Sequence, residues 1–128
     1  MTLSKAEVVT LTDQISGDLI CPPLTTQSDV CGICCDWAKE PPICSKCREA
    51  AAELGTELAP VVPITLYAKP SPMRDRLTYY KDPRDVNDLH FAVEVAALLE
   101  RFFMEHGEEL SQRYGKANIA LIVPTKKR

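Results

Sequence analysis

Long apolar runs and histidines are scarce in this chain of 128 residues, and each scarcity narrows the possible functions. No apolar stretch is long enough for the core of a signal peptide or for a membrane-spanning helix. We therefore expect no membrane partner and take the reducing cytoplasm as the default compartment. The two histidines, His90 and His106, belong to no catalytic motif, so we expect them to face solvent or to cap a helix end, and we assign no catalytic residue.

Clustered basic residues and aromatic side chains are also sparse where a nucleic-acid site would need them. Residues 1–60 carry nine acidic and four basic side chains, whereas residues 61–128 carry nine and eleven. Binding of a phosphate backbone requires clustered lysine and arginine, and binding of single strands also uses aromatic platforms. Nucleic acid is therefore disfavoured as a partner. We expect the single tryptophan, Trp37, to lie as an apolar plug over the site formed by the cysteines on either side of it in the sequence.

Cysteine, in contrast, is plentiful, and four of the six cysteines form two CxxC pairs: Cys31 with Cys34, and Cys44 with Cys47. Two residues between paired thiolates let both sulfurs of a tight turn point inward, and the nine residues between the pairs allow one loop to bring them together. Four thiolates suit the tetrahedral coordination of Zn²⁺. The spacing therefore predicts a structural zinc site in a zinc-ribbon-like module, with no open position for a substrate.

Two other uses of these cysteines are weaker. A disulfide framework suits secreted domains, and the first residues of the chain do not resemble a signal peptide. A thioredoxin-like redox motif would follow a strand, which Pro41 and Pro42 oppose. Cys21 and Cys35 remain; each is either a small buried apolar side chain or a substitute ligand, with Cys35 replacing Cys34 as the first alternative.

The first half of the chain predicts a metal loop followed by a helix. Residues 1–20 show no decisive period and are expected to form a strand or a short helix. Residues 21–47 have too few apolar side chains to fold without an ion. A helix should then begin with Ser45 as its cap and end at Gly55 in the left-handed conformation.

The second half predicts two strands and several helices. The β-branched run 61–69 is typical of a strand, and helical spacing follows over 74–81. An apolar stripe predicts a long helix over 86–106, with a further short helix over 108–114 after Gly107. The continuous apolar run of residues 118–123 indicates a strand covered on both faces. We therefore expect an α+β or α/β fold, with a zinc-binding module over residues 1–58 and a second domain over residues 59–128.

The order of these features resembles a known family. Zinc pairs, the segment from Arg74 to Asp82, a long helix and an apolar strand ending in Val-Pro and basic residues are similar to the N-terminal half of ComF-type (type I) phosphoribosyltransferase-like proteins. The resemblance implies a glycosyltransferase-type α/β domain whose first core strand is Ile119–Val123. It also implies that the residues after this strand meet the pyrophosphate of phosphoribosyl pyrophosphate, with Mg²⁺, and these are Thr125, Lys126, Lys127 and Arg128.

One part of the family pattern is missing. The strand that ends in two acidic residues and leads into a Gly/Thr-rich loop, which holds the ribose 5-phosphate in such enzymes, has no counterpart here. We therefore expect a truncated member that is inactive alone and would need a longer chain to use Mg²⁺ and phosphoribosyl pyrophosphate. The alternative is a free-standing zinc-ribbon module that binds a protein partner. Because the apolar stripe of helix 86–106 lacks a cover, self-association is also expected.

Overall fold

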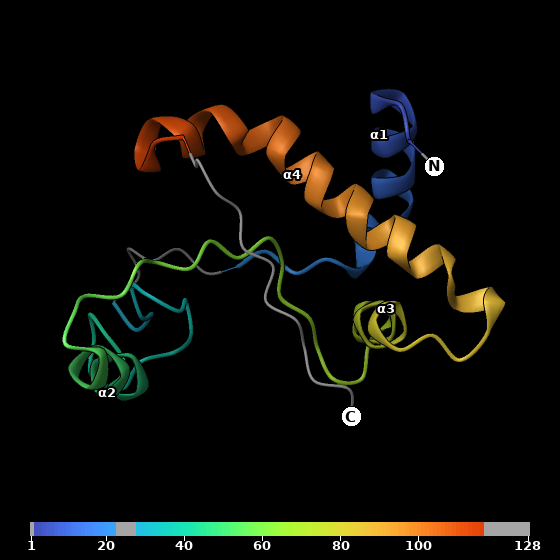
Figure 1. Cartoon of the computed structure of the whole chain (residues 1–128). Coiled ribbons are helices and arrows are strands. Elements are labelled where there is room, and N and C mark those ends of the chain that lie inside the picture. Colours follow the sequence, from blue (N-terminus) through green and yellow to red (C-terminus); the bar gives the residue numbers. More distant parts are fainter. Residues whose placement is uncertain (1, 23–27, 117–128) are drawn as a thin grey trace. The chain divides into compact units, whose positions relative to one another are not determined.

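The computed structural model describes residues 2–22 and 28–116, which divide between two compact units (Figure 1). The helical unit is drawn from Met1–Leu19 and Tyr67–Arg128, and the cysteine-rich unit is Ile20–Leu66. The cysteine-rich unit thus interrupts the sequence of the helical unit, whereas composition predicts two consecutive domains. The predicted boundary near residue 58 stays a prediction.

The helical unit begins with α1 (Lys5–Ile15), followed by the 3₁₀ turn η1 (Ser16–Asp18). A capping box starts α1, because the Ser4 side chain accepts from the backbone N–H of Glu7 while the Glu7 carboxylate accepts from the N–H of Ser4. Of the two structures that the sequence allowed over residues 1–20, the helix is the one formed.

Helix α3 (Pro72–Lys81) agrees with the helical spacing of the sequence. Ser71 caps it by accepting from the N–H of Arg74, and Pro72 takes the first helical position, where a missing N–H costs nothing. The turn after α3 contains η2 (Val86–Asp88), where the carboxylate of Asp88 accepts from the backbone and guanidinium N–H groups of Arg84.

Helix α4 (His90–Tyr114) is the longest element, with 25 residues, and it ends at Gly115. We expected an interruption at Gly107, and the helix instead continues through it. A helical glycine costs about 1 kcal/mol relative to alanine, a penalty that the strong helix formers on either side, including Glu105 and Leu110, offset. The two predicted helices are therefore one.

The core of the helical unit forms where α1 and α3 pack against α4 (Figure 1). Ile15, Met73 and Leu98 are buried together, with one residue from each helix. Other members of the predicted apolar stripe of α4 remain outside this core: Leu99 is 47% exposed and Phe103 is 53% exposed. The expected self-association through this stripe stays a prediction.

A network of charges also joins the three helical segments. The guanidinium of Arg76 on α3 donates to the carboxylate of Asp18 at 2.6 Å and to that of Glu94 on α4 at 2.9 Å. The side chains of Arg76 and Glu94 are largely buried. Because each carboxylate is paired with the same cation, the burial of these charges is compensated.

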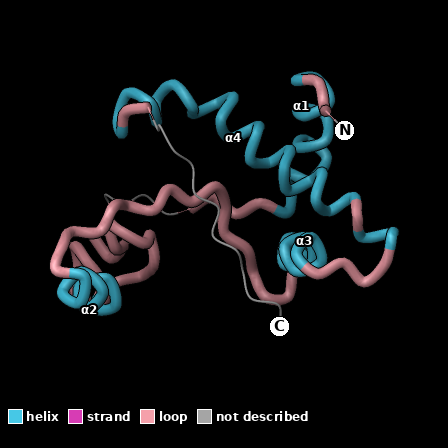
Figure 2. Tube along the Cα trace, viewed as in Figure 1, coloured by secondary structure: helices cyan, strands magenta, loops and turns pink. Residues whose placement is uncertain are grey.

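In the described part of the cysteine-rich unit, α2 (Ser45–Leu54) is the one helix and the remainder is loops (Figure 2). Cys44 is the residue that precedes the helix, in the place expected for Ser45, because its backbone is extended while its carbonyl already accepts from the N–H of Arg48. Gly55 ends α2 in the left-handed conformation (φ 67°), as expected.

The predicted α+β or α/β fold class is wrong for the described residues, which are mostly helical and contain no β-sheet (Figure 2). Two isolated antiparallel bridges, Ile20–Leu66 and Val30–Trp37, are the extent of the β-pairing there. Within the run 61–69, Pro63 has no N–H to donate and Leu66 makes a single bridge, so among the described residues the run forms no strand. The other predicted strand, Ile119–Val123, lies outside the described residues.

Candidate metal centre

The first CxxC pair lies in a tight turn at the tip of a short hairpin. The N–H of Ala38 donates to the carbonyl of Asp29 at 2.8 Å, and the N–H of Cys31 donates to that of Asp36, also at 2.8 Å. The chain reverses direction within the loop that these two bonds close. There the N–H of Cys35 donates to the carbonyl of Cys31. Cys35 takes a left-handed conformation (φ 62°), which points its side chain away from those of the pair.

The second CxxC pair lies at the start of α2. Cys44 immediately precedes the helix and Cys47 is in its first turn, so both side chains are fixed by the helix start. The two pairs are joined through the backbone, because the N–H of Gly32 donates to the carbonyl of Pro42 at 2.8 Å. A side chain at position 32 would approach the Pro42 oxygen to 3.6 Å, an ordinary contact, so glycine is not sterically required there.

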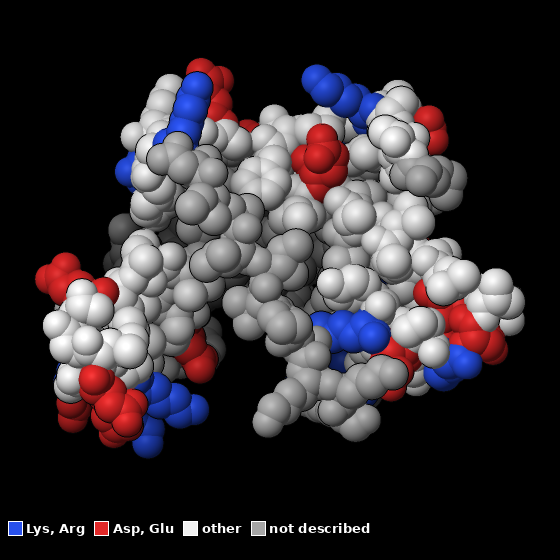
Figure 3. Space-filling model, in the orientation of Figure 1, with Lys and Arg blue, Asp and Glu red and all other residues white. Residues whose placement is uncertain are grey.

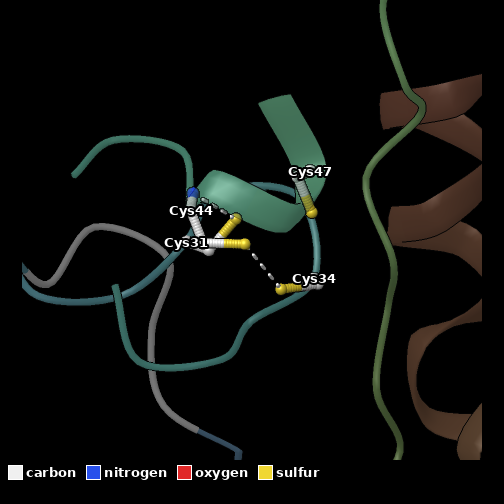
Figure 4. A group of neighbouring side chains, drawn as sticks. All are labelled: Cys31, Cys34, Cys44 and Cys47. Atoms are coloured by element: carbon white, nitrogen blue, oxygen red, sulfur yellow. Dashed lines mark hydrogen bonds between the residues drawn. The ribbon is translucent and has the colours of Figure 1, made fainter. Parts of the chain in front are cut away.

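The four sulfur atoms of Cys31, Cys34, Cys44 and Cys47 lie within 4.8 Å of one another and face a common point (Figure 4). A Zn–S bond of about 2.3 Å places neighbouring sulfurs of a regular tetrahedron about 3.8 Å apart. The Sγ atoms of Cys34 and Cys44 are separated by 3.8 Å. The four sulfurs are therefore close enough to hold a single four-coordinate ion, if the most widely spaced sulfurs move closer together.

Backbone N–H groups are directed at one of these sulfurs. The N–H groups of Ile33 and Cys44 donate to Cys31 Sγ at 3.4 and 3.3 Å. Burial alone would raise the pKa of Cys31, but these donors and the backbone of Cys34 stabilise the thiolate and lower the pKa to about 6. Cys31 is thus prepared as a negatively charged ligand.

Two of the other cysteines, Cys34 and Cys47, are disfavoured as anions in the absence of a cation. Burial, followed by hydrogen bonds with the Cys44, Cys34 and Cys31 side chains, raises the pKa of Cys47 to about 12. The pKa of Cys34 is also raised: the backbone of Asp36 lowers it, but burial and the neighbouring thiols outweigh that effect. Four thiolates this close repel one another, and a divalent cation at their centre removes that repulsion.

The surroundings of the sulfurs are small and apolar. Cys31, Ala38 and Cys47 form the buried centre of the unit, against which Ile33, Ile43 and Leu58 pack. With four protein ligands and this packing, the site leaves no position for a substrate. The contribution of the Ile33 and Cys44 amides was not predicted. The CxxC spacing is the signal for the Ile33 bond, because it forms the turn that directs this N–H at Cys31, whereas the Cys44 N–H comes from outside that turn.

The remaining cysteines and Trp37 lie apart from the sulfur cluster. The Cys35 thiol donates to the backbone oxygen of Val61 at 3.7 Å, and Cys21 is exposed. In this geometry Cys34, rather than Cys35, faces the other three ligands. Trp37 is 65% exposed, so the expected apolar plug is wrong: the bridge with Val30 fixes its backbone, and the small Ala38 is buried instead.

The other predicted site residues, Thr125, Lys126, Lys127 and Arg128, lie outside the described residues. The ring of His90 lies 2.6 Å from the backbone oxygen of Asn87, and His106 is half-exposed beside Glu105 and Glu109. Among the described residues, neither histidine belongs to the group of possible metal ligands, which consists of the four cysteines.

No protein-family model, curated protein or solved structure matches the chain. The resemblance to ComF-type phosphoribosyltransferase-like proteins therefore stays a prediction. Each helix in the part of the chain that the structure describes is too short or too polar to cross a lipid bilayer.

Proposed function

We propose that Cys31, Cys34, Cys44 and Cys47 bind one structural Zn²⁺ ion that holds the cysteine-rich unit in its folded form. The observation that carries the proposal is the approach of four sulfurs around one point, at a spacing that matches a tetrahedral edge. All-sulfur tetrahedral sites suit zinc, and they also suit iron. The test below therefore identifies the metal as well as the stoichiometry.

The chemistry of this centre is structural. A catalytic zinc keeps a coordination position for water or substrate, whereas four cysteine ligands fill the tetrahedron. The unit also needs the ion, because its buried side chains are few and small: Val30, Ala38 and the cysteines Cys31, Cys35 and Cys47. Structural zinc sites contribute on the order of 10 kcal/mol of binding free energy, which in such a unit is folding free energy.

For the unit as a whole we propose a role as a zinc-organised module that binds a protein partner. Trp37 and Leu54 are both more than 60% exposed, and tryptophan is enriched among the residues that dominate protein interfaces. Residues 20–66 carry six acidic and three basic side chains, and the face shown in Figure 3 has more acidic than basic groups over this unit. This charge opposes binding of nucleic acid.

Metal analysis of the purified chain tests the zinc site. We expect about one zinc per chain, and a loss of that zinc in Cys44→Ser. Cys21→Ser removes an exposed thiol and Cys35→Ser removes a thiol outside the cluster, so both should keep full zinc content. A chain that folds fully in the presence of chelator, or that contains iron in place of zinc, would contradict the proposal.

A further inference from the structure

The two halves of the sulfur cluster differ in access to solvent. Cys31 and Cys47 are buried, whereas Cys34 and Cys44 are half-buried. The exposed edge of the cluster is therefore formed by one cysteine from each CxxC pair. A reagent that approaches from solvent meets Cys34 and Cys44 first.

The same two cysteines also lie close enough to react with each other. Their sulfurs are 3.8 Å apart and directly face one another (Figure 4). A disulfide needs these atoms to approach to about 2.05 Å, a movement of less than 2 Å between residues in loops or at a helix start. Cys31, in contrast, is held in place by two N–H···S bonds, which also reduce the nucleophilicity of its sulfur.

We propose that Cys34 and Cys44 form a peroxide-sensitive edge of the zinc site, whose oxidation to a disulfide releases the ion. This inference rests on the proposed zinc site and adds its regulation. The disulfide would remove two of the four ligands, and the two buried cysteines alone do not complete a tetrahedral site. Release of zinc would then unfold the cysteine-rich unit, so that its binding surface exists only under reducing conditions.

The chemistry balances with hydrogen peroxide as the oxidant. One of the two thiolates attacks an oxygen of the peroxide, the O–O bond breaks, and the departing hydroxide takes a proton to leave as water. The second thiolate attacks the resulting sulfenic acid, the S–S bond forms, the S–O bond breaks and a second water leaves. In total, two thiolates, one peroxide and two protons give one disulfide and two waters. The sulfurs lose two electrons and the peroxide gains them.

The experiment uses the zinc-loaded full chain, treated with hydrogen peroxide in the presence of a colorimetric zinc chelator. We expect two thiols to be lost for each zinc released, and the zinc site to reform after reduction and addition of zinc. Trypsin cleaves after Lys39 and Lys46, which separates Cys44 from both Cys34 and Cys47. Mass spectrometry of the peptides, with fragmentation of the linked pair, should locate the disulfide between Cys34 and Cys44.

Matched variants separate this edge from the other thiols. Cys21→Ser and Cys35→Ser should release zinc at rates within about twofold of the unchanged chain, because neither sulfur belongs to the edge. Retention of zinc under peroxide, or a disulfide that joins any other pair as the main product, would overturn the inference while leaving the zinc site intact. Absence of zinc from the chain before oxidation would instead contradict the proposed function.

Discussion

The two units of this chain are stabilised in different ways. The helical unit buries a residue from each of its three helices, Ile15, Met73 and Leu98, and joins them further through the ion pairs of Arg76. The described part of the cysteine-rich unit has one helix, and most of its buried side chains are cysteines. The first unit depends on apolar packing, which any aqueous buffer supports, and the second, by the function proposed above, depends on a metal. Removal of metal should therefore destabilise the cysteine-rich unit and leave the stability of the helical unit unchanged.

Chelation gives the largest expected effect. Removal of zinc should unfold the cysteine-rich unit, with a loss on the order of 10 kcal/mol of binding free energy, and leave the helical unit folded. Trp37 is the only tryptophan and belongs to the cysteine-rich unit, so its fluorescence reports on that unit alone. Far-ultraviolet circular dichroism reports mainly on α1, α3 and α4. Simultaneous loss of both signals on chelation would show that the units are not independent.

A substitution in the helical core should have the converse effect. Leu98→Ala removes a buried side chain that packs with Ile15 and Met73 and should lower the free energy of unfolding of the helical unit by about 3 kcal/mol. Leu99→Ala, at the exposed neighbouring position, should cost less than about 1 kcal/mol. Thermal unfolding followed by circular dichroism measures both. Zinc content should stay at one per chain in each variant. A loss of zinc in Leu98→Ala would contradict the independence of the two units.

Breaking an ion pair in each unit should change the free energy of unfolding by a smaller amount, and the amount should differ between the units. Arg76→Met leaves the carboxylates of Asp18 and Glu94 without their shared cation in a largely buried place, and should cost about 2–3 kcal/mol. Arg48→Met in the cysteine-rich unit breaks an exposed pair with Glu40 and should cost less than about 1 kcal/mol. Denaturant unfolding of the zinc-loaded variants gives the difference. Equal costs would mean that burial of the Arg76 pairs adds nothing to stability.

The turn before α4 should show a dependence on pH. The hydrogen bonds and charge of Arg84 hold the pKa of Asp88 at about 2, below its ordinary value of 3.8. A lowered carboxylate pKa stabilises the folded state above about pH 3.8, and that stabilisation is lost as the pH falls toward 2. Asp88→Asn should therefore be less stable than the unchanged chain at pH 7, and the difference should shrink in acid. A difference that is constant from pH 7 to pH 2 would contradict this assignment.

The smallest expected effect concerns phosphoribosyl pyrophosphate. If Thr125, Lys126, Lys127 and Arg128 supply part of a pyrophosphate site, basic residues without the 5-phosphate motif should give at most a weak attraction that physiological salt screens. Calorimetry with Mg²⁺ should detect no binding at 150 mM salt. Micromolar binding that resists salt and disappears in Arg128→Ala would instead support the resemblance to phosphoribosyltransferases.

The candidate site could be predicted from sequence more completely than the fold. The CxxC spacing identifies four cysteines that the structure brings together, because the geometry of each turn is set by residues close in the sequence. Gly55 likewise marks the end of α2 through its own backbone preference. The pattern Ser4-Lys-Ala-Glu7 was also a readable signal for α1, since a capping box depends on local residues alone.

The errors arose where local preference and longer-range context disagree. The run 61–69 has β-branched residues but no partner strand, so its propensity is not realised among the described residues. Gly107 has a low helix propensity that its neighbours override. The ion pairs of Arg76 join residues up to 58 positions apart, and no local pattern indicates which acidic side chains a basic residue will meet.

The bridge between Ile20 and Leu66 has a consequence for protein engineering. The N–H of Leu66 donates to the carbonyl of Ile20 at 2.9 Å, so the two ends of the cysteine-rich unit lie next to each other. A segment whose ends meet can be inserted into a surface loop of an unrelated protein without separating the host's flanking residues. Residues 20–66 are therefore suited to transplantation as an insert, which by the proposed function would fold only with metal. In this chain, a short flexible linker in place of residues 20–66 should leave α1, α3 and α4 able to fold.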